Sequence, residues 1–254
     1  IPSLPELMRR FGTAPEDISL HFGLFYSVYA FMQFLAAPTL GALSDRFGRK
    51  PVLLLSLLIA SLDYLVMAIA PNLFILFLAR AVSGLCGASV TVCMAYASDI
   101  STRENRGIYF GAISGAFGLG FVIGPALGGV LGHMNPTFPF LAASVLNILN
   151  AIYGFSILPE SLEASKRRAF NLNRLNPFKS LRFMFLSKEV FTLCFIYFLV
   201  VYSASTHPAI WPIYTEYRFG WNSQQIGFSL TLVGILMMFS QGYLSKYLMP
   251  KFGY

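Results

Sequence analysis

The chain alternates long apolar segments with short polar ones. Each apolar segment is about 20 residues long, which is the length that an α-helix needs to cross the hydrocarbon core of a bilayer. Backbone groups inside a bilayer must hydrogen-bond within their own segment, so these segments are predicted to be helices. The seven segments lie at about residues 20–43, 52–70, 73–97, 107–132, 138–158, 190–213 and 224–247. The pattern therefore predicts an all-α membrane protein.

Basic residues are concentrated in every second connection between these segments. The basic connections are residues 44–51, 99–106 and 159–189, whereas those at 70–72 and 135–136 have no Lys or Arg. Because positively charged loops stay on the cytoplasmic side, the three basic connections are expected to be cytoplasmic and the first residues to lie outside. If the N-terminus is cytoplasmic, this orientation also requires a membrane helix before residue 1.

The long basic connection divides the chain into two parts. Five apolar segments precede it, and a helix before residue 1 would make six. Six helices, a basic cytoplasmic linker and a second bundle are the layout of two-half transporters. We therefore expect an N-terminal bundle over residues 1–158, a linker over 159–189 and the start of a second bundle over 190–254.

The composition agrees with a lipid bilayer as the surrounding solvent. Hydrophobic residues make up 56% of the 254 residues and charged residues 11%, whereas a soluble domain has about 25% charged residues. The net charge of +7 could indicate nucleic-acid binding, but nucleic-acid binders gather Lys and Arg on one face of a folded domain. Here the basic residues lie between apolar segments, so the bilayer is the expected partner and nucleic acid is not.

The cysteines and histidines do not form a recognisable metal or catalytic motif. Cys86, Cys93 and Cys194 lie inside apolar segments. Cys86 and Cys93 would be about 10 Å apart along a helix, which is too far for a disulfide. No HExxH or GxSxG motif occurs, and the three histidines lie near separate segment ends. We therefore expect neither an enzyme nor a metal site.

The decapeptide GALSDRFGRK at residues 41–50 follows the first apolar segment. Gly41 and Gly48 would allow close backbone approach and a positive φ. Asp45 could cap the following turn or pair with an arginine. The basic residues of the decapeptide are Arg46, Arg49 and Lys50. They could contact neighbouring helix ends, or the decapeptide could be a basic turn that only sets the orientation.

Asp63 and Arg80 lie away from the ends of their apolar segments, where a charge is costly and indicates a function. Asp63 has no Lys or Arg within four residues. An apolar environment favours the neutral form of a carboxyl group, which suits reversible proton binding. The alternative for Asp63 is a bond to a neighbouring helix. Arg80 lies about two turns into its segment, so its alternative is to reach the membrane surface.

Glycines recur through the segment at 107–132. Small residues at four-residue spacing let two helices approach backbone to backbone, and Pro125 can bend the helix because it lacks a backbone donor. The series comprises Gly111, Gly115, Gly118, Gly120, Gly124, Pro125, Gly128 and Gly129. The alternative is ordinary tight packing.

The decapeptide at 41–50 resembles the signature of the major facilitator superfamily, which lies between the second and third helices. The resemblance implies a major facilitator fold, with this chain holding helices 2–8 of a twelve-helix, two-bundle transporter. It also implies a cytoplasmic gate that latches the two halves. The implied members of the gate are Gly41, Asp45, Arg46, Gly48, Arg49, Lys50 and Asp99.

Other segments resemble the drug:proton antiporters of this superfamily, and the tetracycline efflux pumps in particular. The sequence around Arg80 is similar to the helix-four motif, whose arginine is associated with proton coupling. GPALGG at 124–129, with Gly120 before it, resembles the helix-five motif of antiporters. ASLDY around Asp63 resembles the third helix of tetracycline antiporters, where such an Asp handles substrate or protons. By the same resemblance Gln33 lines the substrate path, with a helix–helix hydrogen bond as its alternative.

These resemblances imply proton-coupled efflux of tetracycline or a related drug-like amphiphile by alternating access. They imply no cofactor, since the proton gradient supplies the energy, and the substrate could be a metal-chelated drug. The alternatives are uptake of a small metabolite by the same fold and an inactive, truncated remnant.

His207 and its neighbouring prolines depart from the tetracycline pumps, which affects the identity of the substrate more than transport. Residues 242–246 and 252–253 repeat parts of the decapeptide, which indicates a duplicated architecture.

Overall fold

The computed structural model describes residues 3–87, 89–167, 176–178, 182–185 and 187–239. Most of these residues are helical, and no strand occurs among them. The helices are α1 (Leu4–Arg10), α2 (Ile18–Phe47), α3 (Arg49–Ile69), α4 (Leu73–Gly87), α5 (Ser89–Ile100), α6 (Arg106–Met134), α7 (Phe138–Ile157), α9 (Lys188–Phe219) and α10 (Ser223–Phe239), with short 3-10 helices at η1 (Ala164–Lys166) and η3 (Arg182–Phe185).

Six helical stretches in the described part of the chain are long and apolar enough to cross a membrane. Five of them are α2, α3, α6, α7 and α9, and the sixth runs from Leu73 to Ile100 through α4 and α5. They confirm six of the seven predicted spans. For the seventh, the apolar helix α10 is described as far as Phe239, and residues 240–247 lie outside the described residues, as does the predicted repeat at 242–253. The chain is thus a multi-pass membrane protein.

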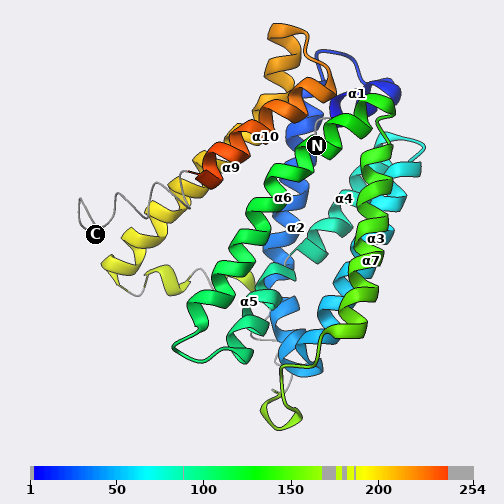
Figure 1. Cartoon of the computed structure of the whole chain (residues 1–254). Coiled ribbons are helices and arrows are strands. Elements are labelled where there is room, and N and C mark those ends of the chain that lie inside the picture. The colour runs from blue at the N-terminus through cyan, green and yellow to red at the C-terminus, as the bar shows by residue number, and fades with distance from the viewer. Residues whose placement is uncertain (1–2, 88, 168–175, 179–181, 186, 240–254) are drawn as a thin grey trace.

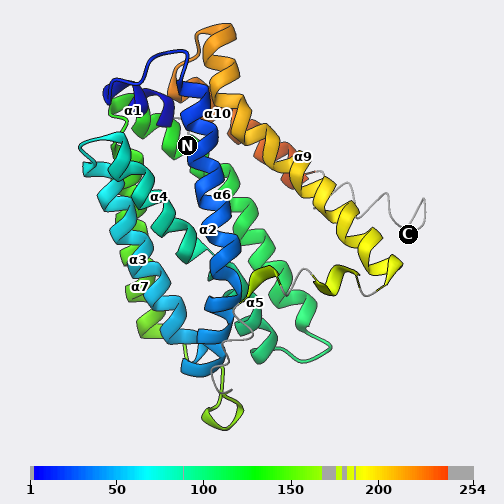
Figure 2. The same ribbon diagram turned by 180° about the vertical axis from the view of Figure 1, so that it is seen from behind.

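The helices that precede the basic linker form one bundle. Figures 1 and 2 show α2, α3, α4, α6 and α7 side by side, with α1 across one end. Within the bundle, α2 packs against α4 and α3 packs against α7. Ser61 on α3 donates to the carbonyl oxygen of Ser144 on α7 at 2.9 Å, and Ser144 donates to that of Ser61 at 2.8 Å. These reciprocal bonds satisfy two buried hydroxyl groups inside an apolar contact.

An apolar core fills the end of this bundle near α1. Short α1 contributes Leu4, Leu7 and Met8, all of them almost fully buried. Around them pack Phe22, Phe25, Met67, Leu76, Ala79 and Phe140, from α2, α3, α4 and α7. Because its apolar side is covered by these helices, α1 is part of the first bundle.

The first two basic connections and the start of the third lie at the end of the bundle opposite α1. Figure 1 shows the α2–α3 turn, the α5–α6 loop and the chain leaving α7 together at this end. The arrangement agrees with the orientation predicted from the charges. We call this the cytoplasmic end and the end with α1 the outer end.

The helices after the linker lie beside α6 and diverge from the bundle. α10 packs against α6, and the last part of α9 approaches the bundle near α1, whereas its first part lies far from it (Figures 1 and 2). Within α9, the buried residues are Pro212 and Thr215, both near its end. The two parts of the described chain therefore meet toward the outer end and separate toward the cytoplasmic end.

Candidate functional site

A cluster of polar side chains holds the turn between α2 and α3. The turn is made by Gly48, whose φ of +105° is a conformation that side chains with a Cβ rarely adopt. Arg49 follows directly, and its Nη1 donates to Oδ1 of Asp45 at 2.6 Å and to Oγ of Ser44 at 2.7 Å. Asp45 therefore takes one of its two predicted roles, because it pairs with an arginine and does not cap α3.

Acidic residues from α5 and from the start of the linker complete this cluster. Nε of Arg49 donates to Oδ2 of Asp99 at 3.0 Å. Glu160 accepts from the backbone N–H of Arg49 at 2.8 Å and from that of Lys50 at 3.2 Å. These are the first two amides of α3, so Glu160 supplies the negative charge that a helix N-terminus favours. The cytoplasmic cluster, as we call it, consists of Ser44, Asp45, Arg49, Asp99 and Glu160.

The start of the linker is fixed against α5 by the same region. Tyr96 donates its hydroxyl proton to the carbonyl oxygen of Pro159 at 2.9 Å, and Ser161 donates to Oδ2 of Asp99 at 3.2 Å. Leu162 is buried beside them. Residues 159–162 are therefore an ordered part of the cytoplasmic end.

The other predicted gate residues have different surroundings. The guanidinium of Arg46 lies 5.2 Å from the ring centre of Phe47, and Nζ of Lys50 donates to the carbonyl oxygen of Phe155 at 2.9 Å. The geometry predicted for Gly41 is wrong. Gly41 has helical backbone within α2, and a Cβ at its position would meet no described atom within 4 Å. The reason is that α2 continues past residue 41, so the turn falls at Gly48 alone.

Arg80 is buried among aromatic rings of α2 inside the first bundle. Its guanidinium carbon lies 4.1 Å from the ring centre of Tyr29, 4.8 Å from that of Phe25 and 5.9 Å from that of Tyr26. A cation–π contact contributes about 2 kcal/mol when the cation is desolvated. Only 8% of Arg80 is exposed, so its side chain packs inside the bundle and does not reach the surface of the chain.

Asp63 on α3 is buried close to the same site, with 3% of its surface exposed. Neither of its carboxyl oxygens has a hydrogen-bond partner among the described residues, and neither does Nε of Arg80. Arg80, on α4, is near enough to act on the carboxyl group electrostatically. The structure thus brings Asp63 and Arg80 to one region between α2, α3 and α4 without an ion pair between them in the described part of the chain.

Gln33 belongs to the close contact between α2 and α4. Its Nε2 donates to the carbonyl oxygen of Gly87 at 2.9 Å, which is the helix–helix hydrogen bond predicted as its alternative. A Cβ on Gly84 would lie 2.6 Å from the carbonyl oxygen of Tyr29, so the two helices approach this closely because residue 84 is glycine. The same contact positions Tyr29 against Arg80. Lining of a substrate path by Gln33 stays a prediction.

The glycine series of α6 makes a close helix contact near the outer end. A Cβ on Gly129 would lie 2.7 Å from the carbonyl oxygen of Ser223 and 2.9 Å from Cα of Gly227, both on α10. A Cβ would meet no described atom within 4 Å at Gly111, Gly115, Gly118, Gly120 or Gly124. Among these six glycines, the predicted backbone-to-backbone packing is therefore seen at Gly129. The same contact continues along α6, because a Cβ on Gly234 of α10 would lie 3.2 Å from the carbonyl oxygen of Phe121.

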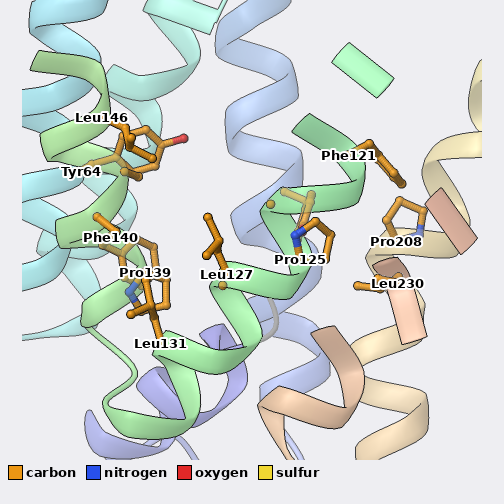
Figure 3. Close-up of a pocket in the computed structure, with 15 residues that line it drawn as sticks. Tyr64, Phe121, Pro125, Leu127, Leu131, Pro139, Phe140, Leu146, Pro208 and Leu230 are labelled. Carbon is orange, nitrogen blue, oxygen red and sulfur yellow. The ribbon is translucent and has the colours of Figure 1, made fainter. Parts of the chain in front are cut away.

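Pro125 and Gly128 line an apolar hollow of about 490 Å³ beside α6. Figure 3 shows side chains that surround it, among them Tyr64, Leu127, Leu131, Phe140 and Pro208. Its lining includes none of Gln33, Asp63 and Arg80. The hollow is therefore distinct from the predicted substrate path, although Tyr26 borders both the hollow and Arg80.

The sequence pattern did not single out Glu160 or Tyr29. Two signals could have identified them. Glu160 is an acidic residue directly after an apolar segment, in a connection that is otherwise basic. Phe25 and Tyr29 are four residues apart, so they lie on one face of a helix and can meet one buried cation together.

Comparisons with known proteins agree with these features. The family model described as Major Facilitator Superfamily matches residues 1–254. The chain is 42% identical over 253 residues to the Tetracycline resistance protein, class C, of Escherichia coli, and 37% identical over 256 residues to the class H protein of Pasteurella multocida. Each match covers 100% of this chain, which spans 63% of the length of each relative.

A solved structure has the same arrangement of helices. The human organic anion transporter MFSD10 (TETRAN) superposes with a TM-score of 0.76 at 26% sequence identity, covering 98% of this chain and 68% of the transporter. The all-α fold and the family resemblance that were predicted from the decapeptide are thereby confirmed.

Proposed function

Because the chain belongs to the major facilitator superfamily, we propose that it is part of a secondary transporter that exports tetracycline, or a related drug-like amphiphile, in exchange for protons. The similarity to tetracycline resistance proteins supports this substrate class. The protein acts as a transporter and not as an enzyme, and it works in the cell (inner) membrane without a nucleic-acid partner. The proton gradient takes the place of a cofactor, and the drug can be carried as its metal chelate.

The buried carboxyl group of Asp63 is the observation that carries the proposal. A charged Asp at the centre of a membrane helix costs about 3 kcal/mol, so the protonated and charged forms favour different surroundings. Its oxygens have no hydrogen-bond partner among the described residues. They are therefore available to a proton or to a cationic or hydrogen-bonding group of the drug. Competition between these two ligands would couple drug export to proton entry.

Arg80 supplies a fixed positive charge beside this carboxyl group. Its guanidinium is held by the rings of Phe25, Tyr26 and Tyr29, so it can stabilise the charged form of Asp63 across a short gap without neutralising it in a direct ion pair. A cation kept at this position favours release of the proton when the site opens to the cytoplasm.

The cytoplasmic cluster acts as the gate in this proposal. Arg49 links the α2–α3 turn to Asp99 on α5, while Glu160 links the start of α3 to the linker. These bonds hold the cytoplasmic ends of three helices and the linker in one arrangement. A rearrangement of Arg49 would then release several contacts together, as an alternating-access cycle requires.

Tetracycline accumulation in cells that express the full-length protein tests the proposal. We compare wild type, Asp63→Asn and the matched exposed control Asp17→Asn, at equal protein levels in the membrane. Wild type and Asp17→Asn are expected to lower accumulation, and a proton uncoupler to abolish this effect. Asp63→Asn removes the proton-binding group, so its accumulation should rise to the level of cells without the transporter.

Two results would overturn parts of the proposal. If membrane-inserted wild type leaves tetracycline accumulation unchanged, the substrate assignment fails, and a panel of other drugs becomes the next measurement. If wild type exports the drug and Asp63→Asn exports it equally well, Asp63 is not the coupling residue.

A further inference from the structure

At the outer end, short α1 contacts the helices that follow the linker. The guanidinium of Arg9 forms an ion pair with the carboxylate of Glu216 near the end of α9. The hydroxyl of Ser223, at the start of α10, donates to Oε2 of Glu6 at 3.5 Å. Each contact joins a residue of α1 to a residue more than 200 positions later in the chain.

These contacts cross between the two halves because α1 is anchored in the first one. Its apolar side is buried in the core of the first bundle. On its polar side, Nη1 of Arg10 donates to Oδ1 of Asn135, in the connection between α6 and α7, at 3.2 Å. Arg9 and Arg10 are thus neighbours on one helix. Arg9 binds a residue of the second half, and Arg10 binds a residue of the first half.

No comparable link between the halves occurs at the cytoplasmic end of the described chain. The ion pairs there, between Arg49 and its two carboxylates, lie within the first bundle. The first turns of α9 are exposed, and Figure 2 shows them far from the α2–α3 turn. In this conformation the two halves are joined outside and apart inside.

We propose that Arg9 and Glu216, assisted by Glu6 and Ser223, form an outer latch that closes the transporter to the outside and opens once in each cycle. The inference rests on the proposed transport by alternating access. The side chains of Arg9 and Glu216 are 45% and 26% exposed, and exposed ion pairs are weak. Such a pair can break in every cycle, whereas a buried one could not be separated cheaply.

The latch borders a polar hollow through which water and reagents can reach it. The hollow has a volume of about 370 Å³, and Glu6, Arg9, His133 and Glu216 are among the residues that line it. A thiol reagent added outside the cell can therefore modify cysteines placed at positions 9 and 216.

Cross-linking tests whether the latch must open. In the full-length protein, with Cys86, Cys93 and Cys194 replaced by serine, the pair Arg9→Cys/Glu216→Cys is joined by a short bifunctional methanethiosulfonate. We expect the cross-link to reduce drug efflux at least tenfold, and reduction of the cross-link to restore it. The matched control Arg10→Cys/Asn135→Cys joins two parts of one half, so its cross-link should leave efflux within about twofold of the untreated protein.

Charge reversal gives a second readout that does not depend on any drug. The reporter is Thr215→Cys, at a fully buried residue next to Glu216, in the protein without its native cysteines. Its labelling by an impermeant maleimide from outside is measured in four backgrounds: no further change, Arg9→Glu, Glu216→Arg and the two reversals together. Each single reversal places like charges opposite each other, so labelling should rise severalfold. The double reversal restores an ion pair and should return labelling toward the wild-type rate.

The outcomes separate the latch from the transport function. Full efflux by a protein cross-linked between positions 9 and 216 overturns the latch, as does equal reporter labelling in all four backgrounds. Absence of tetracycline efflux by untreated wild type overturns the proposed function instead, and the reporter labelling then decides the latch by itself.

Discussion

At the scale of single residues, Arg49 and Arg80 have the same side chain but are stabilised by different surroundings. Arg49 binds Asp45, Asp99 and Ser44 at the cytoplasmic end. Arg80 instead lies among the aromatic rings of α2. A guanidinium suits both sites because it is planar, donates in several directions and stacks on rings. The charge of Arg49, near water, is stabilised by two carboxylates. The charge of Arg80, inside the bundle, is stabilised by aromatic rings, and the carboxyl group of Asp63 forms no ion pair with it.

Replacing Tyr29 tests the second of these sites. Tyr29→Leu removes the ring that lies 4.1 Å from the guanidinium of Arg80, and a cation–π contact of about 1–2 kcal/mol corresponds to a loss of roughly tenfold in the initial rate of efflux. Tyr29→Phe keeps the ring and should remain within about twofold of wild type. The rates are measured in inverted vesicles and normalised to protein level. Equal losses in both variants would show that the hydroxyl, and not the ring, matters.

The sequence reveals the charges of these sites but not their partners. Asp63 and Arg80 could be found because a charge inside an apolar segment is conspicuous. The signals for Tyr29 and Glu160 are weaker, since aromatic residues are common in this chain and an acidic residue after a helix is unremarkable. Their importance comes from contacts between helices that are distant in sequence, which residue spacing along one helix does not contain.

At the scale of elements, the helices extend beyond the apolar segments that predict them. The segment predicted at 20–43 belongs to α2, which continues to Phe47, and the one at 190–213 belongs to α9, which continues to Phe219. Hydropathy marks the part of a helix that lies in hydrocarbon. The helix ends where the backbone turns, here at Gly48 with φ of +105° and at Gly220 with φ of +65°.

The contact between α6 and α10 gives an element-scale prediction. Gly129→Ala would place a methyl group 2.7 Å from a backbone oxygen of α10, and backbone cannot move aside as a flexible side chain can. Overpacking of this kind costs about 1–3 kcal/mol, so the melting temperature of the full-length protein in detergent should fall by several degrees.

Gly107→Ala is the matched control on the same helix. A Cβ at this position meets no described atom within 4 Å, and alanine favours a helix over glycine by up to about 1 kcal/mol. Its melting temperature should be equal to that of wild type or higher. A Gly129→Ala protein as stable as this control would contradict the close contact between α6 and α10.

At the scale of the whole molecule, the two ends differ in what they connect. The cytoplasmic cluster joins helices of the first half to one another and to the linker, whereas α1 joins one half to the other at the outer end. The positions of the basic residues predicted which loops lie on the same side of the membrane. It could not predict where the halves meet, since that depends on how α9 and α10 cross the first bundle.

Accessibility of two glutamates tests this orientation. Glu16 precedes α2 at the outer end, Glu104 lies between α5 and α6 at the cytoplasmic end, and both are exposed. In intact cells that express the full-length protein without its native cysteines, an impermeant maleimide should label Glu16→Cys and not Glu104→Cys. Permeabilising the cells should expose both. Labelling of Glu104→Cys in intact cells would reverse the assignment of the two sides.

The fixed start of the linker has a mechanical consequence. Tyr96 and Glu160 fasten residues 159–162 to α5 and to the first turn of α3, so this stretch moves with the first half as one rigid piece. In the proposed alternating-access cycle, the pivot between the two halves would then lie beyond Leu162. A pull on the linker from the second half would be delivered through the Glu160 carboxylate to the start of α3, next to Arg49, and not to the end of α7. In the proposed transport cycle, the linker would therefore act directly on the gate, through Glu160.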